Sequence, residues 1–347
     1  MEQKKVLDTA ARIVLPLLLG GTILWWMYRQ FDFGNIRHVL LDEMDWTWMW
    51  LSFPFGITAM LFRGWRWQQT LEPLGEKPRQ SVSINAVFLS YAASLVIPRI
   101  GEFTRCGVLK RYDGVSFAKA LGTVVTERAI DTLFILIITG LTIIFQLSVF
   151  GTFFERTGTN IGSILRQFSG TGYLVTAICG VAALILLRIL LKRLSIYNKV
   201  KATLGGIWQG VISLKDVRHP WLFLAFTLAI WASYFLHFYL PFFCFPSTGS
   251  LGLSAVMVIF VVSSIAVVVP TPNGAGPWHF AVKTMLILYG IEDNQALYFV
   301  LILHGVQTLL IIALGLWALL ALAFTKARNE EGGTRNEEGG TRKEEGE

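Results

Sequence analysis

The sequence predicts an all-α fold: a polytopic membrane bundle of about six transmembrane helices with two oppositely oriented re-entrant helical hairpins. Hydrophobic residues make up 54% of the chain and charged residues only 15%, well below the roughly 25% charged residues of soluble domains. The mean hydropathy is +0.55. Apolar runs close to the length that crosses a bilayer alternate with short basic segments. These observations place the chain among integral membrane proteins.

The charge and cysteine content argue against several other classes. The net charge of +7 comes from bases in short segments between apolar runs, where they orient a membrane protein, so we expect no nucleic-acid partner. Cys106, Cys179 and Cys244 are odd in number and widely spaced, which predicts neither a disulfide framework nor a zinc site. The sequence shows no nucleophile beside its base and no dinucleotide fingerprint. We therefore expect no metal, no cofactor and no enzymatic activity.

The first half of the chain predicts three crossings and one hairpin. Residues 13–28 form a retained helix that ends in an aromatic belt. Residues 46–62 return to the cytoplasm at Arg63 and Arg66, and residues 129–150 cross outward. Residues 82–98 are barely long enough to cross and have basic segments on both sides, which predicts a hairpin that enters and leaves by one face.

The second half predicts three further crossings and a second hairpin. The crossings are residues 172–191, 221–243 and 296–324, with an interfacial amphipathic helix at 196–211. Residues 251–279 must return to the outer face for the last crossing to end at the cytoplasmic bases. Both termini are therefore predicted to be cytoplasmic, in a multi-pass protein of a bacterial inner membrane.

Two domains follow from composition. Residues 1–325 form the transmembrane domain, and residues 326–347 form a charged tail with a near-perfect seven-residue repeat. The tail has no apolar side chain to bury, so we expect it to be disordered.

The two hairpins predict an inverted internal repeat. Each apolar run leads to a proline, Pro98 or Pro270, and then to a polar stretch that contains glycine. A polar pair spaced i, i+3 follows each proline: Arg128 with Asp131 in one half, and His304 with Gln307 in the other. Topology places one hairpin on each face, as an inverted repeat requires. Broken helices of this kind direct their positive N-termini toward a mid-membrane anion.

Two ionic clusters are the strongest functional signal. Glu127, Arg128 and Asp131 share part of one helical surface at the start of an apolar run, and a second cluster lies upstream, formed by Arg99, Glu102 and Arg105. Ionisable side chains at membrane depth cost about 2.5–3.5 kcal/mol and usually serve a polar pathway. Arginines gathered with carboxylates can bind phosphate while staying balanced in charge. The alternative is an interface anchor that only orients the helix.

The second hairpin is dense in helix breakers. Pro270, Pro272, Asn273, Gly274 and Gly276 predict a structural turn, with a phosphate-cradling loop as the alternative. The histidines in or near the spans are His237, His279 and His304, for which polar packing between helices is the ordinary role.

These motifs resemble those of a known family. Pro98-x-x-Gly101-Glu102-x-x-Arg105, then Glu127-Arg128-x-x-Asp131, then Pro270-x-Pro272-x-Gly274-x-Gly276 resemble the transmembrane domain of lysylphosphatidylglycerol synthases, over roughly residues 10–325. The resemblance implies movement of modified lipids between leaflets. Many members have Gly at the position of Asn273 and Glu at that of His279. We expect no lipid aminoacylation, because the sequence ends after the last span without the soluble domain of the bifunctional members.

The resulting expectation is a flippase-like transporter whose partner is a membrane lipid, an anionic phospholipid or a glycolipid. Two alternatives are a membrane subunit for polyprenyl-linked sugar or glycolipid assembly and an intramembrane lipid-modifying transferase. Headgroup binding is assigned to Arg99, Glu102, Arg105, Glu127, Arg128, Asp131, His304 and Gln307. A structural role in the hairpins is assigned to Pro98, Gly101, Pro270, Pro272, Asn273, Gly274, Gly276 and His279.

Overall fold

The computed structural model describes residues 18, 20–29, 33–145 and 216–326. These residues form helices joined by turns and contain no strand, which confirms the predicted all-α class. The first helical segment among the described residues is 20–28. It is followed by the short helices η1 (Phe33–Asn35), α2 (Ile36–His38) and η2 (Val39–Glu43). The longer helices then fall into two sets with the same order of lengths.

The first set is a long helix, two short helices and a second long helix. Its members are α3 (Trp46–Leu71), α4 (Gln80–Val96), α5 (Ile100–Asp113) and α6 (Phe117–Phe145), with η3 (Glu72–Leu74) after α3. Asp45 caps α3, because its carboxylate accepts a hydrogen bond from the Thr47 N–H at 2.9 Å. Hydrogen bonding from the Thr47 side chain, together with this backbone bond, lowers the pKa of the exposed Asp45 carboxyl group. Helices α4 and α5 pack on each other as a hairpin.

The second set repeats this order. Its members are α11 (Pro220–Tyr239), α12 (Leu253–Ala266), α13 (Pro277–Leu288) and α14 (Asp293–Ala323), with η5 (Leu240–Cys244) after α11 and η6 (Pro272–Gly274) between α12 and α13. Helices α12 and α13 form the second hairpin. Here the α4–α5 pair is named the first hairpin and the α12–α13 pair the second hairpin.

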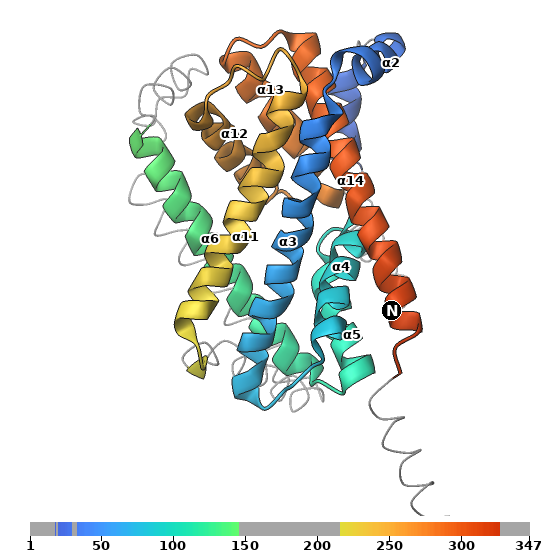
Figure 1. Ribbon diagram of the computed structural model, residues 1–347, viewed down its shortest axis with the longest axis vertical. Coiled ribbons are helices and arrows are strands. Elements are labelled where there is room, and N and C mark those ends of the chain that lie inside the picture. The colour runs from blue at the N-terminus through green and yellow to red at the C-terminus, as the bar shows by residue number, and fades with distance from the viewer. Residues whose placement is uncertain (1–17, 19, 30–32, 146–215, 327–347) are drawn as a thin grey trace, which may run out of the picture.

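The two sets are inverted with respect to each other. In Figure 1 the first hairpin occupies the lower half of the bundle and the second hairpin the upper half. Helices α3 and α14 run downward, whereas α6 and α11 run upward. The hairpin tips meet between the two ends, where Nη2 of Arg99 donates a hydrogen bond to the Val268 carbonyl at 3.0 Å.

Both tips contain a left-handed residue that is not glycine. Arg99 has a φ of 62° and Asn273 a φ of 52°, and they are the two such residues in the described part of the chain. An L-residue in this region costs about 1–2 kcal/mol, so neighbouring contacts must hold each tip in place.

The first hairpin closes tightly because Gly101 lacks a side chain. A Cβ atom at this position would lie 1.9 Å from the Ser90 carbonyl oxygen, which belongs to the facing helix. Helix α14 approaches α4 in a similar way, since a Cβ on Gly315 would lie 2.3 Å from Cβ of Ala92. The close contact of small residues fits helix packing within a membrane.

Each hairpin has its own hydrophobic core. The first surrounds Trp67, Val87 and Leu109, and also takes in Leu322 at the end of α14. The second surrounds Ile259, Phe299 and Leu303, and also takes in Met49 near the start of α3. Helices α3 and α14 therefore connect the two cores along the length of the bundle.

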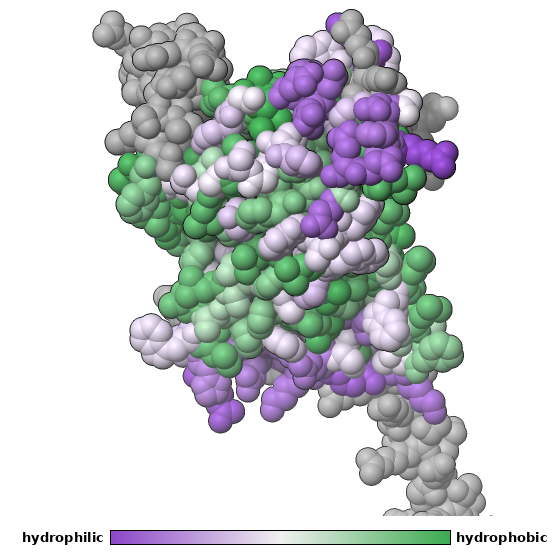
Figure 2. All heavy atoms as spheres, turned by 45° about the horizontal axis from the view of Figure 1, so that its top comes forward, coloured by the Kyte–Doolittle hydropathy of each residue, from purple (hydrophilic) through white to green (hydrophobic). Residues whose placement is uncertain are grey.

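Many large apolar side chains are exposed on the outside of the bundle. Figure 2 shows a wide band of hydrophobic side chains with hydrophilic residues gathered toward the two ends. Among the described residues, three helical segments are long and apolar enough to cross a membrane: Phe117–Phe145, Pro220–Cys244 and Asp293–Ala323. Large side chains on them such as Leu136, Leu228 and Leu316 are exposed, as lipid contact requires.

The structure moves the end of one predicted helix. Helix α3 does not end at Phe62; it continues through Arg63 and Arg66 to Leu71, and both arginines are buried. The expectation that the helix ends before these two bases is therefore wrong. The predicted crossing at 172–191, the interfacial helix at 196–211, the start of the first helix and the charged tail after residue 326 lie outside the described residues.

Candidate functional site

A buried ionic network joins α3, α5 and α6 at the first hairpin. Asp131 on α6 accepts hydrogen bonds from Nη1 of Arg63 at 2.9 Å and from Nη2 of Arg66 at 2.8 Å. Arg128, on the same helix, approaches Asp131 at 3.3 Å. Asp131 is therefore the point where α3 is fastened to α6.

Glu127 lies one turn before Asp131 and ties the same helix to the hairpin. Its Oε2 lies 2.7 Å from Nη2 of Arg105 on α5, and its Oε1 lies 3.8 Å from Nε of Arg66. The Glu127 side chain is fully buried. A buried carboxylate is tolerated only when it is paired, so the fold depends on these two arginines. Glu102 completes the network through an ion pair of 3.4 Å with Arg128.

The helical spacing of the residues explains how one network collects so many charges. Arg63 and Arg66 are spaced i, i+3 on α3, and Glu127 and Asp131 are spaced i, i+4 on α6, so each pair lies on one face of its helix. Arg105 is oriented by Trp67, whose ring centroid lies 4.6 Å from its guanidinium carbon.

The network contains more positive than negative charge. Its basic members are Arg63, Arg66, Arg105 and Arg128, and its acidic members are Glu102, Glu127 and Asp131. When all of these groups are ionised, one positive charge is in excess. Nη1 of Arg105 has no hydrogen-bond partner among the described residues although the side chain is 3% exposed. Buried donors of this kind are seldom left without a partner.

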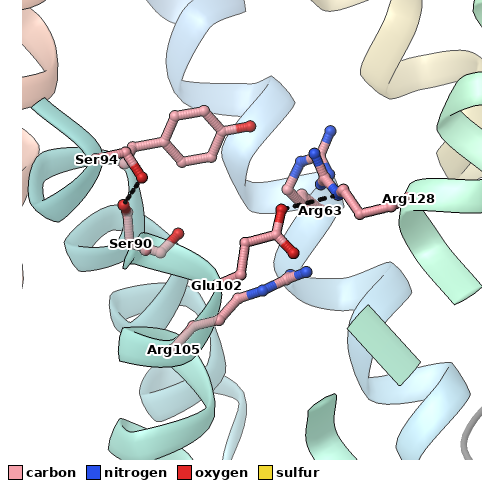
Figure 3. Close-up of a pocket in the computed structure, with 8 residues that line it drawn as sticks. Arg63, Ser90, Ser94, Glu102, Arg105 and Arg128 are labelled. Carbon is pink, nitrogen blue, oxygen red and sulfur yellow. Dashed lines mark hydrogen bonds and ion pairs between the residues drawn. The ribbon is translucent and has the colours of Figure 1, made fainter. Parts of the chain in front are cut away.

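A small cavity lies beside the network. It is lined by Arg63, Ser90, Tyr91, Ser94, Gly101, Glu102, Arg105 and Arg128. Figure 3 shows the Glu102 side chain extending toward Arg63 and Arg128, with Arg105 nearby and the two serines on the opposite side. The cavity volume of about 70 Å³ suffices for a few water molecules.

The serines present acceptors to this cavity. The Ser90 hydroxyl donates its hydrogen to the Val87 carbonyl at 2.7 Å, and the Ser94 hydroxyl donates to the Ser90 carbonyl at 2.9 Å. Each hydroxyl oxygen therefore still has lone pairs that can accept a hydrogen bond. The cavity therefore has hydroxyl acceptors on one side and guanidinium donors on the other, with the Glu102 carboxylate beside the guanidinium groups.

The tyrosines of α4 and α11 connect this cavity to α3. The hydroxyl groups of Tyr91 and Tyr234 are hydrogen bonded to each other, and Nε of Arg63 donates to the Tyr234 hydroxyl at 3.3 Å. Arg63 thus contacts α6 and α11 at once, which makes it a central residue of the site.

The structure divides the predicted headgroup residues into two groups. Glu102, Arg105, Glu127, Arg128 and Asp131 lie together in the ionic network. The other three lie elsewhere: Arg99 at the first tip, and His304 and Gln307 on α14 beside the second hairpin and α11. The eight residues therefore do not form a single site in this structure. The residues of α14 that pack in the first core, from Ile311 to Leu322, come after His304 and Gln307.

The second hairpin has a neutral polar cluster at its tip. Nδ2 of Asn273 donates to the Thr308 hydroxyl at 2.8 Å, and Nε2 of His304 lies 3.1 Å from the Asn273 carbonyl oxygen. Gln307 donates from Nε2 to the His237 carbonyl at 3.0 Å. This cluster fastens the tip of the second hairpin to α14, and α14 in turn to α11.

The glycines of this tip adopt conformations that favour glycine. Gly274 has a φ of 71° and Gly276 a φ of 91°. A Cβ on Gly276 would also lie 2.9 Å from the Gly20 carbonyl oxygen in the first helix, so the tip packs closely against residues 20–28. These glycines act in the turn and in packing, as the structural interpretation of the motif expects.

The sequence interpretation missed two residues of the network, Arg63 and Arg66. Basic residues after an apolar run usually mark the cytoplasmic end of a span, and that rule placed Arg63 and Arg66 beyond the end of the helix. One signal was available: the segment from Trp65 to Leu71 contains neither proline nor glycine, and Pro73 is the first helix breaker beyond it. In the described residues no cluster of three or more His, Cys, Asp or Glu could hold a metal ion.

The fold and this site define a multi-pass helical membrane protein with a buried ionic centre. The family model described as lysylphosphatidylglycerol synthase TM region matches residues 13–315, which is most of the chain. The protein therefore belongs to this lipid-related membrane family, as the motif resemblance predicts. Searches of the curated proteins and of the solved structures gave no match.

Proposed function

We propose that this protein moves a phospholipid, or a glycolipid linked through phosphate, between the leaflets of a membrane. The headgroup phosphate binds in the cavity of the first hairpin while the acyl chains stay in lipid. Family membership supports the general class, and the ionic network supports the choice of a phosphate-bearing cargo.

One observation carries the proposal: the network has one arginine more than it has carboxylates, and the buried Arg105 keeps a donor without a partner beside a cavity. Guanidinium groups bind phosphate oxygens through paired, charge-assisted hydrogen bonds. A phosphate would supply the missing negative charge and the missing acceptor at once.

The acceptors of the cavity narrow the cargo further. Glu102, Ser90 and Ser94 offer oxygens to a group that carries hydrogen-bond donors. A headgroup with amino or hydroxyl hydrogens matches this arrangement better than a quaternary ammonium, which has none. Because the cavity holds only a few water molecules, a lipid enters only after the hairpins move apart.

The proposed membrane arrangement keeps six crossings and makes the two hairpins re-entrant from opposite leaflets. Helices α4 and α12 have 17 and 14 residues and are apolar but short for a full crossing. The inverted order of the two sets and the contact between their tips fit alternating exposure of one central site. We place the protein in a bacterial inner membrane with both termini cytoplasmic.

The test is a leaflet-exposure assay in proteoliposomes. Purified protein is reconstituted with acyl-labelled fluorescent phosphatidylethanolamine, and dithionite reduces the label in the outer leaflet. We expect the wild type to expose nearly all of the label and Arg128→Gln to slow this exposure at least tenfold, because Arg128 lines the cavity. Arg218→Gln is the matched control, since Arg218 is largely exposed and far along the chain from the network.

Two results would oppose the proposal. Equal rates for Arg128→Gln and the wild type would exclude the cavity as the pathway. A change in the mass of the lipid during incubation would instead support the transferase alternative. Movement of polyprenyl-linked sugars without movement of phospholipid would instead narrow the cargo to the glycolipid, as the assembly alternative expects.

A further inference from the structure

A buried histidine and a half-buried histidine touch at the tip of the second hairpin, away from the ionic network. His279 on α13 and His304 on α14 have ring centroids 4.4 Å apart, and the His279 side chain is 3% exposed. These two residues are named the histidine pair. Nothing in the proposed headgroup site uses them.

Each member of the histidine pair holds one residue of the tip. The Gly276 N–H donates to Nδ1 of His279, with 3.4 Å between the two nitrogens, and Nε2 of His304 lies 3.1 Å from the Asn273 carbonyl oxygen. His279 stands at the third position of α13, so its ring caps the N-terminus of that helix. These contacts require an unprotonated Nδ1 on His279 and a hydrogen on Nε2 of His304.

The surroundings of the pair contain few other titratable groups. The Tyr28 ring, from the first helix, lies 6.2 Å from His279, and Trp278 lies beside both histidines. Lys283, one turn further along α13, is paired with Asp293 at 2.8 Å. No carboxylate of the described residues forms a hydrogen bond with either ring of the pair.

A proton on Nδ1 of His279 is incompatible with this arrangement for three reasons. It occupies the lone pair that accepts the Gly276 N–H, so the cap of α13 is lost. It places a positive charge in the first turn of a helix, where the helix dipole is already positive. It also does so beside a second imidazole in an apolar site, where an unpaired charge is poorly solvated. The proton therefore binds more tightly to a conformation in which the tip has left the ring.

We propose that the histidine pair is the binding site of a coupling proton, and that proton uptake on His279 releases the 273–276 tip and opens the second-hairpin end of the protein. The proton comes from water at that end and returns to water when the tip closes again. This inference rests on the proposed function, because the coupling proton is the ion that would drive the proposed lipid movement. The opening would reach the headgroup site through the tip contact of Arg99 with Val268.

A cysteine reporter tests the site without requiring transport. Ala275→Cys, which is partly buried within the tip, is labelled with a maleimide in nanodiscs between pH 8 and pH 5. Asn294→Cys, exposed at the start of α14, corrects for the ionisation of the thiol, and the protein without a reporter corrects for its native cysteines. We expect the ratio of the two labelling rates to rise about fivefold or more as the pH falls, the usual scale of coupling between two sites.

Variants separate proton binding from general loosening. His279→Gln keeps an acceptor for the Gly276 N–H but cannot take up a proton, so its ratio stays constant with pH. His304→Gln shifts the midpoint without abolishing the response, because His279 still titrates. His38→Gln, which removes an exposed histidine paired with Glu43, leaves the wild-type profile intact.

A ratio that stays constant in the wild type overturns the proton site, and so does an equal rise in His279→Gln or an unchanged profile in both variants of the pair. These outcomes differ from failure of the proposed function. Lipid movement in a protein with no pH-dependent opening refutes the proton site alone. A pH-dependent opening without lipid movement refutes the lipid function and leaves the proton site standing.

Discussion

The first hairpin packs against a network of seven ionisable side chains, whereas the second hairpin ends in neutral histidine, asparagine and aromatic residues. Their backbones are alike: two short helices, a tip with a left-handed residue that is not glycine, and a long helix on either side. The same inverted scaffold therefore carries two different chemistries at its two ends.

The difference indicates that the two hairpins of an inverted repeat can have different roles. The ionic network has an excess of positive charge and a cavity, so it is suited to an anion. The histidine pair lies in an apolar setting and bonds directly to the backbone of a tip, so it is suited to a change of conformation. One hairpin would hold the cargo and the other would control access to it.

The largest expected effect on stability comes from a substitution in the ionic network. Arg66→Met removes the partner that Asp131 and Glu127 share, and it leaves carboxylates buried without full compensation. Breaking such a pair costs about 3–5 kcal/mol, so we expect that loss in the free energy of unfolding measured in mixed micelles. Arg218→Met, at an exposed pair of 3.8 Å, should change stability by less than about 1 kcal/mol. A similar loss in both variants would contradict the structural role of the network.

A somewhat smaller loss of stability is expected from adding a side chain at the close contact between α4 and α5. Gly101→Ala places a Cβ against the Ser90 carbonyl, so the hairpin must open by separating α4 and α5. Overpacking of this kind costs about 1–3 kcal/mol, and thermal unfolding would measure it. Gly107→Ala, on the same helix with no atom within 4 Å of the added Cβ, is the control. It should be neutral or stabilising by up to about 1 kcal/mol, because alanine favours a helix.

The smallest expected effect on stability comes from the left-handed backbone conformation at the two tips. Arg99→Gly and Arg99→Ala both lose the hydrogen bond to Val268, but only glycine adopts the left-handed conformation without cost. We expect the glycine variant to be the more stable of the two by about 1–2 kcal/mol. The same pair of substitutions at Asn273 should give the same order. Equal stabilities would mean that the tips are not held in this conformation.

The sequence supported the class, the family and the order of the hairpins, because apolar runs, prolines and basic flanks are local signals. It also singled out Glu102, Arg105, Glu127, Arg128 and Asp131, since charge inside an apolar stretch is unusual, and the structure places these five side chains in one ionic network. It could not show that Arg63 and Arg66 turn inward, because the orientation of a helix beyond an apolar run depends on the partner that faces it. Nor could it separate Gln307 and His304 from the ionic network, since that depends on which part of α14 each hairpin contacts.

The most direct test of the central claim is the binding of phospholipid to the ionic cavity. Native mass spectrometry of the detergent-purified protein would measure bound phosphatidylethanolamine in the wild type, in Arg105→Lys and in Arg218→Lys. Lysine keeps the charge that Glu127 requires but lacks the second guanidinium donor, so we expect Arg105→Lys to weaken binding about tenfold. The Arg218→Lys control should match the wild type. Equal lipid retention in all three proteins would contradict the claim that the unpartnered donor of Arg105 binds the headgroup.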